Sequence, residues 1–115
     1  MLTVLKSQSL LRMACGALSG IIRYLSGSDL ERALRSGAHK LLNFPCLDEE
    51  LCTPLQEAAL HSRPECLDMV RILLEWGADP NVPDYFGENA VPWALWGDDL
   101  SIVLAKLKLL VHGGA

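Results

Sequence analysis

The sequence predicts an all-α solenoid of paired antiparallel helices joined by hairpin-like turns. A shift of 36 residues aligns Ala58 with Ala94 and Gly77 with Gly113, with apolar residues matched between them. Self-similarity at a fixed period indicates stacked copies of one small structural unit. No strand-length stretch alternates apolar with polar residues, which disfavours a sheet-based fold.

The central unit carries the clearest signals for where helices begin and end. Thr53 is a good N-cap, and the proline after it suits the first helical position, so a short helix is expected from Pro54 to about His61. A second helix is expected from Pro64 to Trp76, where Gly77 ends it as a left-handed C-cap. Residues 79–84 contain two prolines and cannot continue that helix.

The flanking units repeat this plan less clearly. Downstream, Asn89 is expected to cap a short helix through Trp96, and a long helix is expected from about Leu100 to His112. Upstream, apolar residues at helical spacing favour a packed first helix over about residues 8–26. We expect one domain over residues 1–115, with units at about 8–43, 44–82 and 83–115. Since no polar helix follows the last unit, it is either capped by its own surface or truncated from a longer array, and we favour the second.

Two stretches of the central unit resemble a known repeat. They are Thr53-Pro54-Leu55-Gln56-Glu57-Ala58-Ala59 and Val70-Arg71-Ile72-Leu73-Leu74 with Gly77-Ala78-Asp79-Pro80-Asn81. They are similar to T-P-L-H-x-A-A, V-x-x-L-L and G-A-D-x-N of the ankyrin repeat, closely over residues 53–82 and loosely over 84–115. The resemblance implies about three repeats and non-catalytic recognition of a partner protein. Gln56 and Pro92 stand where the family has a histidine that bonds neighbouring hairpins, so we expect weaker polar ties between repeats.

The resemblance also implies where a partner binds, because hairpin tips and first helices line the concave surface of such arrays. The residues at those positions are Glu57, Leu60, His61, Asp84, Tyr85, Phe86, Glu88, Trp93 and Trp96. Aromatic residues dominate interface energetics, and the acidic residues around them favour a basic partner segment with an apolar anchor. Trp93 and Trp96 have a competing interpretation as core residues, since aromatics at helical spacing are more often structural.

Charge is distributed unevenly along the chain. Residues 1–40 hold six Lys or Arg against two acids, and residues 41–115 hold four against twelve. The net charge of −4 argues against nucleic-acid binding, which depends on neutralising phosphates. A basic first end and an acidic last end favour head-to-tail self-association. The alternative function is therefore a structural or oligomerisation segment of a longer array, such as one that recruits substrates to an adaptor. No apolar run reaches the roughly 18 residues of a membrane span.

Catalytic, cofactor and metal sites are not expected. Known catalytic motifs are missing, and Cys46-x5-Cys52-x8-His61-x4-Cys66 lacks the short spacings that organise zinc. Four irregularly spaced cysteines favour a reducing compartment, the cytoplasm or nucleus. The alternative is a mitochondrial location, because residues 1–28 contain basic residues and serines but no acid.

Overall fold

The described part of the chain is entirely helical. The computed structural model describes residues 17–43, 52–61, 63–84, 86–97 and 99–114, and these ranges contain no strand. Residues 17–24 are helical. The elements that follow are α2 (Gly27–Arg35), the 3-10 helix η1 (Ala38–Leu41), α3 (Pro54–Leu60), α4 (Pro64–Glu75), α5 (Ala90–Ala94) and α6 (Leu100–His112). The predicted all-α class is confirmed at this level.

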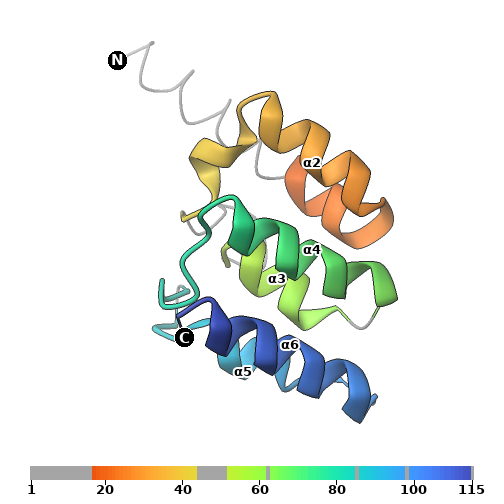
Figure 1. The fold of residues 1–115 in the computed structure, drawn as a ribbon. Coiled ribbons are helices and arrows are strands. Elements are labelled where there is room, and N and C mark those ends of the chain that lie inside the picture. The colour runs from red at the N-terminus through yellow and green to blue at the C-terminus, as the bar shows by residue number, and fades with distance from the viewer. Residues whose placement is uncertain (1–16, 44–51, 62, 85, 98, 115) are drawn as a thin grey trace.

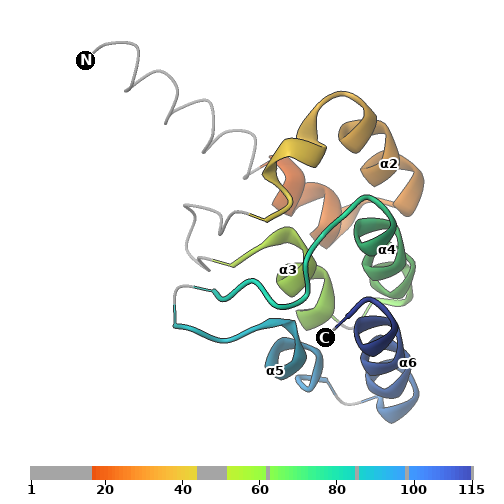
Figure 2. The ribbon, with the colours of Figure 1, turned by 60° about the vertical axis from the view of Figure 1, so that its left-hand side comes forward.

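The helices lie in two layers (Figures 1 and 2). One layer contains α2, α4 and α6, with α4 in contact with both of the others. The second layer contains the helical residues 17–24, α3 and α5, and α3 packs against α5. Contacts of α3 with α4 and of α5 with α6 join the layers. Consecutive helices therefore form pairs, and each pair lies beside the next.

The N-cap and the first-turn proline predicted at the start of α3 are both present in the structure. Thr53 Oγ1 accepts a hydrogen bond from Gln56 N at 3.3 Å, and Gln56 Oε1 accepts one from Thr53 N at 2.8 Å. This capping box satisfies two backbone donors that a helix start leaves without partners. Pro54 occupies the first turn, where its missing N–H is not needed.

The other helices also end at or slightly before the predicted residues: α3 ends at Leu60 and α4 at Glu75, where His61 and Trp76 were expected, and the first helical segment ends at residue 24 and not at 26. Gly77 follows α4 with a φ of 101°, a left-handed conformation that favours glycine. The bounds of α6 are those predicted. Helix α5 ends at Ala94, two residues before the predicted Trp96, because the chain tightens there. Leu95 N and Trp96 N bond to the carbonyls three residues back, a 3-10-type turn.

Between α4 and α5 the chain makes a hairpin-like turn that extends away from the helices (Figure 2). Asp84 N donates to Glu88 O at 2.8 Å, and Gly87 N donates to Asp84 O at 3.1 Å. Gly87 has a φ of 83°, which a side chain would disfavour. This turn carries several of the residues predicted to contact a partner.

Apolar residues from both layers meet in one core. Small side chains predominate where α3 packs on α5, and larger ones fill the layer of α2 and α4. The buried residues include Ala58, Ala59, Ala90, Ala94, Leu30, Leu34, Met69, Val70 and Leu73. Ala58 and Ala94 are the pair that the 36-residue shift aligned, so the repeat period reflects equivalent buried positions.

Loss of the α3 cap tests how much this short helix depends on its first turn. We expect Thr53→Ala to lower the free energy of unfolding by about 1 kcal/mol, because Gln56 N loses its acceptor. Urea unfolding followed by circular dichroism measures this. Ser101→Ala, at an exposed position of α6, is the control and should change stability by less than about 0.5 kcal/mol. Equal effects of the two substitutions would contradict a stabilising role for the cap.

Candidate protein-binding cleft

Six of the nine predicted contact residues line one cleft of about 390 Å³. Leu60 comes from the end of α3, Trp93 lies in α5, and Trp96 follows it. The turn between α4 and α5 supplies the other three, Asp84, Phe86 and Glu88. The structure thus brings together residues separated by up to 36 positions in the sequence. Tyr85, a further predicted contact, lies outside the described residues.

Asp84 holds the cleft together and does not lie on the surface, in contrast to the sequence prediction. Its Oδ1 accepts hydrogen bonds from Phe86 N at 2.8 Å and Glu88 N at 2.9 Å. Its Oδ2 accepts one from Trp93 Nε1 at 2.8 Å. Only 6% of the residue is exposed because these three donors surround the carboxylate. Asp84 is therefore a positioning residue that fixes the turn relative to α5.

Two aromatic side chains remain open to solvent at the cleft. Phe86 is 75% exposed and Trp96 is 71% exposed, so the interpretation of Trp96 as a core residue is wrong. Trp93 is intermediate: it packs against the core, and its indole is held by Asp84. The cleft therefore has one fixed aromatic wall and two exposed aromatic side chains.

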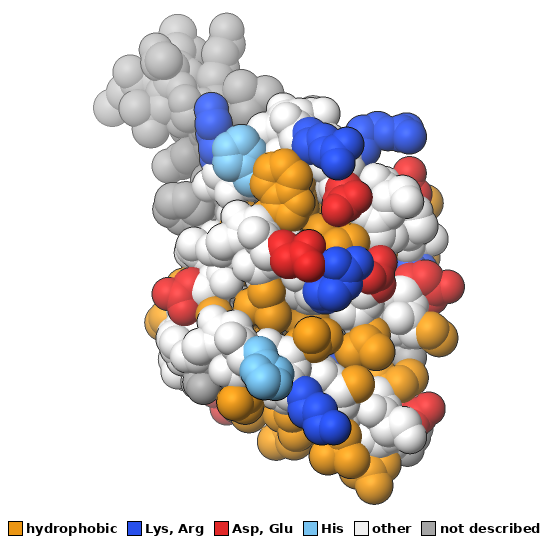
Figure 3. All heavy atoms as spheres, in the orientation of Figure 1, with side chains coloured by type: hydrophobic (Ala, Val, Ile, Leu, Met, Phe, Trp, Pro, Cys, Tyr) orange, Lys and Arg blue, Asp and Glu red, His pale blue; other side chains and the backbone are white. Residues whose placement is uncertain are grey.

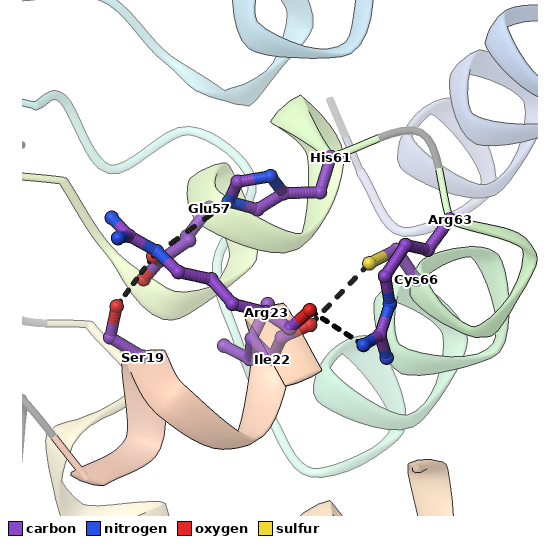
Figure 4. Close-up of polar contacts among 7 residues, drawn as sticks. All are labelled: Ser19, Ile22, Arg23, Glu57, His61, Arg63 and Cys66. Carbon is purple, nitrogen blue, oxygen red and sulfur yellow. Dashed lines mark hydrogen bonds and ion pairs between the residues drawn. The ribbon is translucent and has the colours of Figure 1, made fainter. Parts of the chain in front are cut away.

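Glu57 is also buried, again in contrast to the sequence prediction. Its Oε1 accepts a hydrogen bond from Ser19 Oγ at 2.5 Å and lies 2.7 Å from Arg23 Nε (Figure 4). His61 Nε2 lies 3.9 Å from the same oxygen. A buried carboxylate needs such partners because burial disfavours an unpaired charge. Glu57 thus joins α3 to the helical residues 17–24 and does not line the cleft. The half-exposed His61 lies beside it rather than at the cleft.

The same junction is held by groups from the start of α4. The Arg63 guanidinium donates to Arg23 O at 2.5 Å, and Cys66 Sγ donates to Ile22 O at 3.5 Å (Figure 4). Arg63 also donates to Leu25 O. These carbonyls end the helical segment 17–24, and the last carbonyls of a helix lack partners within it. Arg63 and Cys66 satisfy them from the next pair of helices.

Gln56 ties α3 to the turn on its other side. Its Nε2 donates to Val82 O at 2.8 Å and to Glu88 O at 3.3 Å. Gln56 therefore provides two polar ties to the neighbouring turn at the position where weaker ties were expected. An amide has both a donor and an acceptor group, so Gln56 closes the capping box through Oε1 and bonds the neighbouring turn through Nε2.

Lys106 is the most completely buried charged residue in the described ranges, and it was not among the predicted site residues. Its side chain is 0% exposed, and Nζ donates to Ala59 O at 2.8 Å and His61 O at 2.6 Å. The cation thereby caps the C-terminal end of α3, where positive charge is favourable. A signal was present in the sequence, because Lys106 stands 36 residues after the buried Val70.

Two buried side chains at or near this contact, Cys66 and Lys106, have shifted pKa values. Burial raises the pKa of the Cys66 thiol, and the nearby Arg63 and Lys106 partly oppose that shift. Burial lowers the pKa of Lys106, because the charged ammonium loses its hydration. In both cases burial is the largest cause of the shift.

The described ranges offer neither a metal site nor a membrane-spanning helix. Those ranges contain no group of three His, Cys, Asp or Glu placed to hold a metal ion. Cys46, one of the residues considered for zinc, lies outside them. Within the same ranges no helix has both the length and the apolar character needed to cross a bilayer.

Comparison with known families agrees with this geometry. Residues 50–85, which include α3, α4 and the start of the following turn, match the family model of the ankyrin repeat. A comparison with curated proteins gives no significant match. Ankyrin repeats are in general protein–protein interaction modules and are typically non-catalytic.

The raised pKa of Cys66 predicts a pH-dependent stability difference. The unfolded thiol ionises near its ordinary pKa of 9.0, while the buried thiol stays protonated to higher pH. Stability from this group is therefore fully present below about pH 9 and is lost as pH rises toward the folded pKa. Urea unfolding of the wild type and Cys66→Ala at several pH values should show the wild-type advantage falling above pH 9. An advantage that stays constant up to pH 10 would refute the shift.

Proposed function

We propose that the chain is an ankyrin solenoid of about three repeats that binds a partner protein without catalysis. The proposed units at about 8–43, 44–82 and 83–115 each contribute one helical pair. Support comes from the match at residues 50–85 and from the contacts of α3 with α5 and of α4 with α6. In this arrangement the cleft lies between the second and third units, on the side of the turns.

The observation that carries this proposal is the cleft with its exposed aromatic side chains. Phe86 and Trp96 present large apolar surfaces to water, which is unfavourable unless a partner covers them. Trp93 is fixed through Asp84, so the cleft is partly organised before binding. A preorganised site loses less conformational entropy on binding. Aromatic side chains in such sites contribute roughly 2 kcal/mol or more when they act as hot spots.

Charge at the cleft favours a basic residue in the partner. The carboxylates of Glu57 and Asp84 are occupied by internal donors, so the exposed Glu88 supplies the negative charge at the rim. A lysine or arginine beside Glu88 can also lie over an aromatic face, where cation–π attraction adds about 0.5–1 kcal/mol. We propose a partner segment in which such a residue stands next to an apolar anchor.

A structural role is the second candidate function. The exposed apolar residues of α6 favour it, because they lie on a different element from the cleft. The two roles are compatible in one chain, since a surface for assembly on α6 leaves Phe86 and Glu88 available.

Selection from a random peptide library displayed on phage tests the proposed recognition and does not require an identified partner. We expect the wild-type chain to enrich peptides with Lys or Arg next to an aromatic or branched aliphatic residue. Phe86→Ala combined with Trp96→Ala should weaken binding of those peptides by at least about thirtyfold, because two hot-spot side chains are lost.

Tyr24→Ala is the matched control, because Tyr24 is also 75% exposed but lies away from the cleft. It should leave peptide binding unchanged, and circular dichroism should show both variants folded. Peptides that bind the double variant as well as the wild type would contradict recognition through this cleft.

A further inference from the structure

Helices α4 and α6 are equivalent under the 36-residue shift but differ on their outward faces. Four outward positions of α4 are occupied by Pro64, Asp68, Arg71 and Glu75. The equivalent positions of α6 are all apolar: Leu100, Leu104, Leu107 and Val111. We call these four residues of α6 the apolar stripe. Leu100 is 69% exposed, Leu104 49% and Val111 63%, whereas Leu107 is partly buried against the core, so three of the four side chains meet solvent in the single chain.

The outward face of α4 carries the charged residues that are typical of a helix face exposed to water. Arg71 Nη2 lies 2.5 Å from Asp68 Oδ1, and Arg71 Nη1 lies 2.8 Å from Glu75 Oε1. These exposed ion pairs follow the helix at three- and four-residue spacing. Figure 3 shows charged side chains over α4, whereas hydrophobic side chains gather at the lower end of the view, over α6. The replacement of a charged face by an apolar one indicates that α6 is covered by an occupant.

The spacing within the apolar stripe indicates which occupant fits. Its residues follow one another at intervals of four, three and four, the seam spacing of packed helix pairs. The intervals are symmetric about their centre, so an antiparallel copy of α6 matches Leu100 with Val111 and Leu104 with Leu107. A two-fold interface requires this kind of self-complementary surface. We propose that the apolar stripe pairs with the stripe of a second copy of this chain, forming a symmetric antiparallel α6–α6 dimer.

Charge supports the antiparallel arrangement. Asp99 caps the first turn of α6, and Lys108 and the exposed His112 lie toward its last turn. Antiparallel pairing places the acidic beginning of one α6 near the basic end of the other, and it opposes the two helix dipoles. A parallel pairing would place like ends together. The dimer differs from the head-to-tail association predicted from overall charge, because it is closed and stops at two chains.

Sedimentation equilibrium of the full chain tests this proposal over concentrations from about 10 µM to about 1 mM, the range in which weak interfaces assemble. We expect a monomer–dimer equilibrium without larger species. Leu100→Glu and Val111→Lys should each weaken dimerisation at least tenfold. Both substitutions suit α6 itself, because an acid is favourable at its first turn and a base at its last.

The matched control is Leu25→Glu, at an exposed leucine outside α6. It introduces the same charge and should leave the dimer unchanged. Circular dichroism should show all three variants folded.

Mixing the two α6 variants tests the register. In a mixed antiparallel dimer, Glu at position 100 of one chain faces Lys at position 111 of the other, and the second contact remains Leu100 with Val111. An equimolar mixture should therefore form dimers at concentrations where each variant alone is monomeric. A wild type that stays monomeric throughout, growth beyond dimers, dimerisation insensitive to the two substitutions, or a mixture without recovery would each overturn the proposal. Monomeric behaviour would assign the stripe to another protein or to further repeats.

Discussion

The structure depends on how the short central helix α3 satisfies its polar groups while almost completely buried. Residues 54–59 are all buried, so water cannot satisfy the helix ends or the Glu57 carboxylate. The neighbours on each side supply the partners instead: Arg23 and Ser19 bind Glu57, and Lys106 binds the carbonyls of Ala59 and His61. Each neighbouring pair of helices is thereby tied to α3 by bonds whose loss leaves a buried group unsatisfied, which costs about 1–3 kcal/mol.

This constraint also positions the cleft. Gln56, at the third position of α3, donates to carbonyls of the turn that carries Phe86 and Glu88. Asp84 then holds that turn to α5 through Trp93. Phe86 consequently stands on a turn fixed at both sides, and the exposed Trp96 lies just after α5, to which that turn is held. Glu57 and Asp84, two of the acidic residues predicted on the binding surface, are used for this internal support, which leaves the exposed aromatics and Glu88 as the residues proposed for recognition.

Local signals in the sequence predicted the helices well. Thr53-Pro54 and Gly77 mark ends that short-range capping determines, and the structure places them as predicted. Of the nine residues that the resemblance to ankyrin repeats placed on one surface, six line the cleft. The burial of Glu57 was missed because Arg23 lies 34 residues away in sequence and the match becomes visible only in the folded chain. The hydrogen bonds of Asp84 depend on the geometry of the turn, which the sequence does not specify. The burial of Lys106 could be predicted only by comparing it with the equivalent buried residue of the preceding unit, Val70.

Hydrogen exchange measured amide by amide tests most directly whether α3 depends on its neighbours. Lys106→Met keeps the apolar stem and removes only the ammonium, and Lys108→Met makes the same change at an exposed position of α6. We predict that Lys106→Met lowers the opening free energy of α3 and α6 amides together by about 1–3 kcal/mol. The control should leave both helices unchanged. Protection of α3 that is the same in Lys106→Met and in the wild type would contradict the account.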